Sequence, residues 1–282
     1  MALGLQKSSG TGGLSMKKTL AVLFLYMRVK AKGKYEYRAA FWLDALSFLF
    51  GYGAQTLLMV LLTQKFDTIN GWTPFEVMLL YAYTLASYTL ANALLSDVMW
   101  SLSRRIRTGD FDQTLTKPMK PLTYEIVTGF SPYYFLHFFL ALGMVAIGVT
   151  QLHVPVTPLT VLQIACGILG GACVQGGVLL LFASASFFWI NNPLTGNFYT
   201  NIRPLIEYPI SVYPKFFQVL LTTLIPLAFV SFYPVQQISG RQDFGLFPPV
   251  VRHLSLPVGI AFLLIAYAVF AAASKHYKST GS

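Results

Sequence analysis

One compact charged stretch interrupts a chain that is otherwise mostly apolar. Residues Arg104 to Leu122, RRIRTGDFDQTLTKPMKPL, include five basic and two acidic side chains. Charged groups at this density can form ion pairs and hydrogen bonds with another protein, or can simply be solvated. Their spacing matches no metal site and no pairing of a nucleophile with a base. The stretch is therefore a candidate for recognition, and the flanking elements must position it.

Motifs for nucleotide binding or hydrolysis are missing from the sequence. It contains no G-x-x-x-x-G-K-[ST], no G-x-S-x-G and no H-E-x-x-H. Cys166 and Cys173 have no partners at metal-ligand spacing, and the four histidines are scattered. We expect no catalytic activity and no cofactor bound by this chain. Any ATP that it uses must be bound by another chain.

The composition is that of a membrane protein. Of the 282 residues, 55% are hydrophobic and 11% are charged, whereas soluble domains carry roughly 25% charged residues. A helix needs about 20 mainly apolar residues to cross a bilayer, and an open sheet cannot satisfy its backbone there. We predict an all-α, polytopic membrane helix bundle with about six transmembrane helices, over residues 41–63, 77–102, 133–150, 159–190, 216–233 and 257–274.

The basic residues orient this bundle. Eight lie before the first predicted span, five after the second, two between the fourth and fifth and two in the tail, whereas the opposite loops hold three. Because basic residues favour the cytoplasmic side, both ends of the chain are predicted to be cytoplasmic (N-in/C-in). This asymmetry also accounts for the formal net charge of +10 without nucleic-acid binding.

The residues before the first span divide into two parts. Residues 1–15 are rich in Gly and Ser and are predicted to be a disordered leader, followed by a single transmembrane domain over 16–282. Residues 17–38 repeat apolar positions at helical spacing beside basic ones, so we predict a basic interfacial helix. A signal peptide is the alternative, but RVKAKGK offers no small-residue cleavage site.

Few polar side chains fall inside the predicted spans. Asp97 lies close to Arg104 in sequence, which favours an ion pair at the interface over a proton relay. Gln175 lies deep in the fourth span and could form a hydrogen bond between helices or face a conduit. The same span carries small residues four apart, which permit close helix packing within one subunit or between two subunits, at Gly167, Gly171 and Gly176.

Prolines complicate the region between the fourth and sixth spans. The stretch 191–215 contains Pro193, Pro204, Pro209 and Pro214, so we predict a bent connector at the inner interface. Pro226 then interrupts the fifth span. Residues 216–256 form either a kinked full span plus a loop or a re-entrant hairpin. The second topology would require an earlier crossing around 185–208.

The charged stretch itself predicts a short helix. Asp110 and Asp112 can cap it, Phe111 and Leu115 lie at helical spacing, and prolines follow. Composition alone does not distinguish a solvated loop from a helix that binds a partner.

The order of residues in this loop resembles the ABC-2 type permease family. That family has a loop of the form R-x-G-x-[FLI]-[DE]-x-x-L-x-x-P after its second span, which corresponds here to Arg107, Gly109, Phe111, Asp112, Leu115 and Pro118. Residues 208–240, with YPISVYP and PLAF, are similar to a segment of one bacterial branch of the family.

The resemblance implies the permease subunit of an ATP-binding cassette transporter, most often an exporter, in the bacterial cytoplasmic (inner) membrane. Two ATPase subunits would bind ATP and Mg, and a second permease, the same or different, would complete the assembly. The loop 103–124 would hold a coupling helix that docks on the ATPase through Arg105, Arg107, Gly109, Asp110, Phe111, Asp112, Leu115 and Pro118. A secondary transporter and a membrane scaffold are the alternatives.

Overall fold

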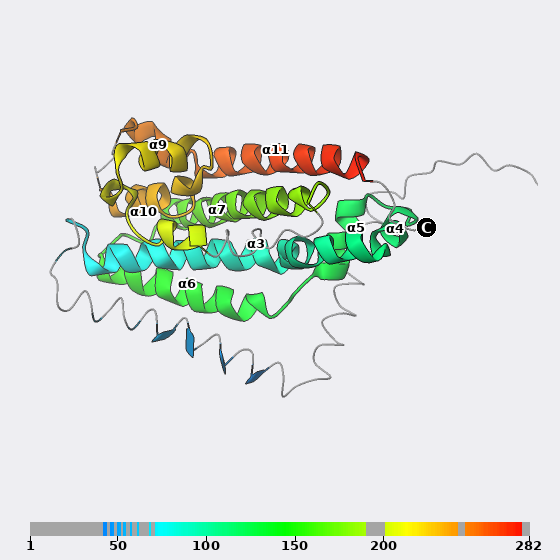
Figure 1. The fold of residues 1–282 in the computed structure, drawn as a ribbon. Coiled ribbons are helices and arrows are strands. Elements are labelled where there is room, and N and C mark those ends of the chain that lie inside the picture. Colours follow the sequence, from blue (N-terminus) through cyan, green and yellow to red (C-terminus); the bar gives the residue numbers. More distant parts are fainter. Residues whose placement is uncertain are drawn as a thin grey trace, which may run out of the picture.

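A computed structural model describes residues 71–189, 201–241 and 246–277, together with isolated positions between 42 and 68. The predicted leader 1–15 and interfacial helix 17–38 lie outside the described residues, as does most of the first predicted span, 41–63. The described chain is a bundle of long helices with short helices at both ends (Figure 1).

Within the described residues, four helices are long and apolar enough to cross a membrane, which confirms the prediction of an all-α polytopic bundle. They correspond to the predicted second, third, fourth and sixth spans. These helices are α3 (Pro74–Thr108), α6 (Tyr134–Gln151), α7 (Pro158–Ala185) and α11 (Ser255–Lys275).

Local sequence explains where the two central helices begin. In α3 the Glu76 carboxylate accepts hydrogen bonds from the backbone N–H and the hydroxyl of Thr73, at 2.8 and 2.9 Å. In α7 the Thr157 hydroxyl accepts from the backbone N–H of Thr160 at 3.2 Å. Each helix has proline at its first position, where no backbone donor is needed.

Helix α3 is the centre of the bundle. In the most apolar 18-residue stretch of α3, 83% of the residues are buried, compared with 28% in that of α11. Helix α6 packs along one side of α3, α7 packs along another, and α11 covers α7 (Figure 1). A helix buried on all sides needs apolar residues around its whole circumference, which explains the continuous apolar run of α3.

Glycines in α7 allow its neighbours to approach closely. A Cβ on Gly167 would lie 2.8 Å from the Tyr83 ring, and one on Gly171 would lie 2.5 Å from the Ser87 hydroxyl. Gly170 meets the backbone of α11 at Ser255 and Gly259. The predicted small-residue face therefore packs against helices of its own chain.

Two short helices follow α3 at one end of the bundle, which we call the inner end. They are α4 (Asp110–Leu115) and α5 (Pro121–Gly129). The end of α11 lies at the same end (Figure 1), and its neighbour Tyr277 contacts Phe111 of α4. The loop after the second span and the C-terminal end of the last helix therefore share one side.

Helices α3, α7 and α11 run in the same direction. Gly167 and Gly176 of α7 meet Tyr83 and Leu95 of α3 in that order, and Gly170 and Gly177 meet Ser255 and Phe262 of α11. Because α7 ends at the inner end and α11 begins at the outer end, the chain must cross back between them.

The crossing is complete before α9 (Lys215–Thr223) begins. Phe187 contacts Phe111 at the inner end, whereas the Ile206 carbonyl, in η1 (Arg203–Ile206), already accepts a 3.2 Å hydrogen bond from Thr84 in the outer half of α3. The chain is therefore at the inner end at Phe187 and in the outer half of the bundle at Ile206.

The fifth span thus differs from our first interpretation. Helix α9 and the pair η3 (Leu227–Phe229) and α10 (Phe232–Ser239) are bent by 77° at Pro226 and both lie at the outer end (Figure 1). This arrangement fits the re-entrant alternative, so we call Lys215–Ser239 the re-entrant hairpin, and 201–213 are not an inner connector. Proline density indicated a bend, but only the contacts of Ile206 showed on which side it lies. Short 3-10 turns, η2 (Ile210–Val212) and η4 (Pro249–His253), flank this hairpin.

Candidate functional site

The inner end is organised around a sharp junction at Gly109. This residue ends α3 and begins α4 with φ of 76°, a left-handed conformation that glycine adopts without strain. Its carbonyl accepts from the Asp112 N–H at 3.0 Å, and the Thr108 hydroxyl donates to the Asp110 carboxylate at 2.7 Å. The predicted short helix after the second span is therefore present and is held at a fixed angle.

An aromatic cluster anchors the buried side of α4. The Phe111 ring is fully buried and meets Phe187 and Tyr277 edge to face, with centroids 5.4 and 5.0 Å apart. Phe187 in turn meets Phe270 of α11 at 5.4 Å. Phe111 thus joins α4 to the inner ends of α7 and α11, whereas we expected it to insert into a partner protein.

A polar network anchors the same helix to α3 and α5. The side chain of Glu125 is fully buried and accepts hydrogen bonds from the Thr114 hydroxyl, at 2.8 Å, and from Arg105. Arg105 also pairs with Asp97 at 2.6 Å. A buried carboxylate needs such partners, because an isolated charge in a low-dielectric site is costly. The partner of Asp97 is therefore Arg105 and not Arg104, which we had predicted from proximity in sequence.

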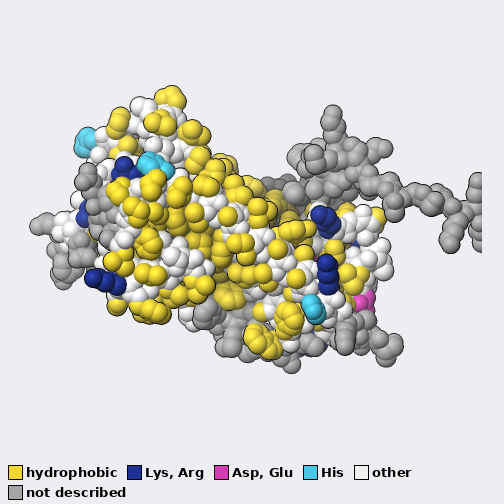
Figure 2. Space-filling view, turned by 90° about the horizontal axis from the view of Figure 1, so that it is seen from above, with side chains coloured by type: hydrophobic (Ala, Val, Ile, Leu, Met, Phe, Trp, Pro, Cys, Tyr) yellow, Lys and Arg dark blue, Asp and Glu magenta, His cyan; other side chains and the backbone are white. Residues whose placement is uncertain are grey.

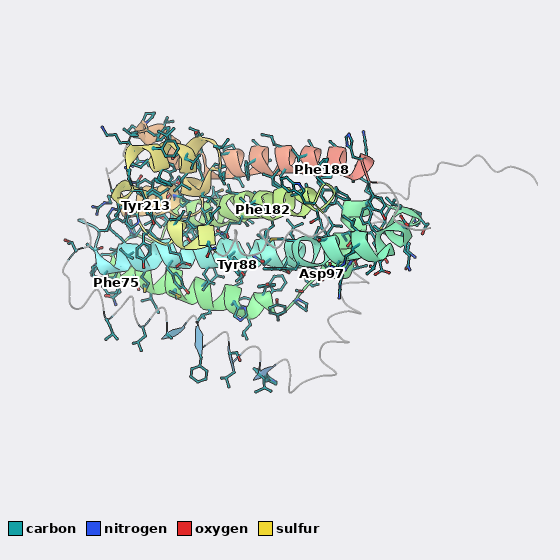
Figure 3. All side chains as sticks on the ribbon, in the orientation of Figure 1. Phe75, Tyr88, Asp97, Phe182, Phe188 and Tyr213 are labelled. Carbon is teal, nitrogen blue, oxygen red and sulfur yellow. The ribbon has the colours of Figure 1, made fainter. Side chains whose placement is uncertain are left out.

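A close backbone approach completes this network. A Cβ on Gly129 would lie 2.7 Å from the Cβ of Asp97, so α5 can pass α3 at this height only with glycine. Asp97 lies near the inner end of α3 (Figure 3). Three helices thus meet around one arginine.

The other predicted coupling residues form the exposed rim of α4. Arg107, Asp110, Leu115 and Pro118 are exposed, and Gly109 and Asp112 are half-buried. Leu115 is 48% exposed although it is apolar, whereas Phe111 and Thr114 point into the protein. The surface that α4 offers to a partner is thus Leu115 flanked by charges.

Sequence reasoning missed several residues that hold this site. Glu125 had one signal, since it is a lone acid in the apolar run PLTYEIVTGF. Phe187, Phe270 and Tyr277 had none, because aromatic residues are common throughout the spans and nothing in the sequence shows which of them meet.

Gln175 takes part in a second polar cluster, between α7, the outer half of α3 and the residues around Ile206. Its Nε2 donates to the Thr84 carbonyl at 3.1 Å, and the Thr84 hydroxyl donates to the Ile206 carbonyl. The Ser231 hydroxyl donates to the same carbonyl at 2.7 Å. Of the two predicted roles, this geometry corresponds to a hydrogen bond between helices. Within the described ranges, no group of three or more His, Cys, Asp or Glu residues could hold a metal ion.

Comparison with protein-family models identifies the family of this chain. The family model described as ABC-2 family transporter protein matches residues 49–281. The chain belongs to the ABC-2 family. Comparison with curated proteins and with solved structures found no match.

Membership of the ABC-2 family assigns the general role of the chain. It is an integral membrane protein and the permease component of an ABC transporter, in a family whose permeases associate with an ATPase subunit and usually with a second permease. The match includes the inner-end loop, α4 and the re-entrant hairpin. The interpretation from the charged stretch is therefore confirmed at the level of the family.

Proposed function

We propose that this ABC-2 permease is an exporter subunit of the cytoplasmic membrane, driven by ATP that a separate ATPase subunit binds with Mg and hydrolyses. Two ATPase subunits and a second permease, the same or different, would complete the transporter. The observation that carries this proposal is the two-sided character of α4. Its buried side is fastened to the bundle, and its other side exposes Leu115 at the inner tip.

An apolar side chain with charges around it is a suitable docking element. Burial of a leucine in a pocket of the partner contributes about 1.5 to 3 kcal/mol, and surrounding charges fix the orientation. Arg107 and Asp110 are exposed around the junction of α3 and α4 and can supply those charges. The ATPase would thus contact the rim of α4 and not Phe111.

The attachments of α4 would carry motion into the membrane. When ATP binding brings two ATPase subunits together, a force on α4 reaches α3 and α5 through Glu125 and Arg105, and reaches α7 and α11 through Phe111. Helix α3 is one continuous helix of 35 residues, so displacement of its inner end moves the whole helix.

Affinity purification tests the proposal. The tagged permease is purified from native membranes in mild detergent, the co-purifying subunit is identified by mass spectrometry, and its vanadate-sensitive ATPase activity is measured. We expect a cassette ATPase with the unaltered chain and its loss with Leu115→Asp.

Val250→Asp is the matched control, because Val250 is also an exposed apolar residue (60%, compared with 48% for Leu115) but lies at the outer end. This variant should retain the ATPase. An unaltered permease that purifies without any ATPase would favour the secondary transporter or scaffold. Retention of the ATPase by Leu115→Asp would place docking elsewhere.

A further inference from the structure

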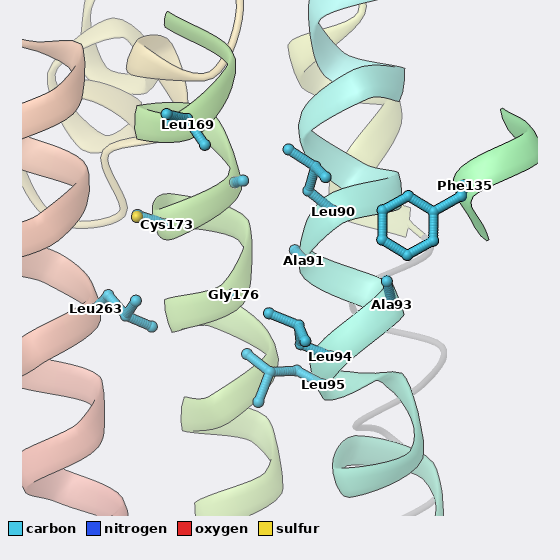
Figure 4. Close-up of a pocket in the computed structure, with 11 residues that line it drawn as sticks. Leu90, Ala91, Ala93, Leu94, Leu95, Phe135, Leu169, Cys173, Gly176 and Leu263 are labelled. Carbon is cyan, nitrogen blue, oxygen red and sulfur yellow. The ribbon is translucent and has the colours of Figure 1, made fainter. Parts of the chain in front are cut away.

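An apolar crevice opens between α3, α7 and α11 at mid-height. It has a volume of about 290 Å³ and is lined by leucine, alanine, phenylalanine, cysteine and glycine residues, among them Leu94, Leu95, Cys173, Gly176 and Leu263 (Figure 4). Leu94 is 41% exposed and Leu169, also in its wall, is 50% exposed, so the crevice opens to the side of the bundle.

The crevice lies within the inner half of the bilayer. Gly176 lies against Leu95 of α3 and Leu263 of α11, so these three residues share one level. From there Tyr267 is four residues and Trp100 five residues toward the inner end, or about 6 to 8 Å along each helix. Tyr267 and the exposed Trp100 are thus at similar depth, as expected for aromatic residues at the inner membrane interface.

A cation lies at the inner end of this crevice. The Lys120 ammonium donates a 3.4 Å hydrogen bond to the Tyr267 hydroxyl and lies 5.9 Å from the centroid of its ring. Tyr267 and Leu263 are four apart and share one face of α11. Among the described residues, no carboxylate lies within ion-pair distance of Lys120.

The distances match one leaflet. From the level of Tyr267 to Leu169, at the far side of the crevice, is about 16 Å, given four residues along α11 and seven along α7. Half of a bilayer's hydrocarbon core is about 15 Å. Figure 2 shows the α11 side of the molecule, with hydrophobic side chains along its length and basic side chains at both ends.

We propose that this crevice binds one anionic phospholipid of the inner leaflet. Its phosphate lies at Lys120 and Tyr267, and one acyl chain runs past Leu263 into the space beside Cys173 and Gly176. An ammonium and a phenol hydroxyl can both donate to phosphate oxygens. The apolar walls select a hydrocarbon chain and offer a polar cargo no hydrogen bond.

Two substitutions test the two halves of the site separately. Cys173→Phe fills the crevice, and Cys166→Phe is its control, because Cys166 is seven residues away on the same helix, is also half-buried, and does not line the crevice. Lys120→Gln removes the cation, and Lys117→Gln removes an equal charge that lies over Tyr124.

The measurement is native mass spectrometry of the delipidated full-length permease, titrated with dioleoyl phosphatidylglycerol or dioleoyl phosphatidylcholine. We expect one phosphatidylglycerol to bind more tightly than phosphatidylcholine. Lys120→Gln should weaken phosphatidylglycerol binding about fivefold, the effect of one basic residue near an anionic surface, and should leave phosphatidylcholine unchanged. Cys173→Phe should weaken both by at least about tenfold, since its ring occupies the place of the chain.

The controls decide the interpretation. Both control variants should bind as the unaltered chain does, and size-exclusion profiles check that each variant is folded. The proposal would be overturned if folded Cys173→Phe bound lipid as tightly as the unaltered chain. It would also be overturned if Lys117→Gln and Lys120→Gln weakened phosphatidylglycerol binding equally. No ATPase takes part in the assay, so its result is independent of the proposed export function.

Discussion

The guanidinium of Arg241 lies 4.4 Å from the centroid of the Trp72 ring at the outer end of the protein. It also pairs with the Glu76 carboxylate at 3.0 Å and donates to the Gly71 carbonyl at 2.8 Å. Trp72 is fully buried and meets Phe232 of α10 at 5.6 Å. One arginine therefore connects the end of the re-entrant hairpin to the start of α3. This contact lies at the opposite end of the bundle from α4.

We predict that this outer contact stabilises the hairpin. Arg241→Ala should lower the free energy of unfolding by about 1 to 2 kcal/mol, since it removes a partly buried ion pair and a cation–π contact. Arg241→Lys keeps the charge but loses the flat guanidinium over Trp72, so it should retain only part of the stabilisation that Arg241 provides. Thermal unfolding in detergent measures both.

A double-mutant cycle with Glu76→Gln checks the ion pair itself. The double variant should lose less unfolding free energy than the sum of the losses in Arg241→Ala and Glu76→Gln, because both substitutions remove the same interaction. Strict additivity would show that the two side chains act independently.

We predict that Glu125 is needed for communication and not for docking. Glu125→Gln weakens the pair with Arg105 while Leu115 stays exposed, so the ATPase should still co-purify. The permease should stimulate the activity of the ATPase less, and the free energy of unfolding of the permease should decrease by about 1 to 3 kcal/mol.

Glu76→Gln is the matched control for Glu125→Gln. It makes the same change to a buried acid paired with arginine, but at the outer end. Its ATPase stimulation should be normal. Equal stimulation in both variants would refute a role of the Glu125 network in coupling.

We predict that α9 is accessible from outside the cell. Lys215 is exposed at the start of α9 and lies on the outer side, although a straight fifth span would place it inside. In a Cys166→Ala, Cys173→Ala background, Lys215→Cys should react with a membrane-impermeant maleimide in intact cells.

Gln113→Cys, at the exposed rim of α4, should react only after the membrane is permeabilised. Labelling of Lys215→Cys only after permeabilisation would restore the straight span and exclude the re-entrant topology.

Much of this protein could be predicted from its sequence. Apolar runs of about the length that a bilayer requires, or longer, identified the spans that correspond to α3, α6, α7 and α11, because a helix in lipid must satisfy its own backbone. The residues from Arg107 to Pro118 identified the inner-end loop and its short helix. Both are local patterns, and neither depends on which helices are neighbours.

Only the tertiary structure decided which side chains face a partner and where the fifth crossing lies. Phe111 and Leu115 are four apart in the same short helix, yet Phe111 is buried by Phe187 and Tyr277, which are far away in sequence. Arg105 selects Asp97 and Glu125 because α5 passes close to α3 at Gly129. Hydropathy is an average over neighbours along the chain. Burial and side-chain pairing depend on neighbours in space, and a short stretch of sequence does not show which distant residues those are.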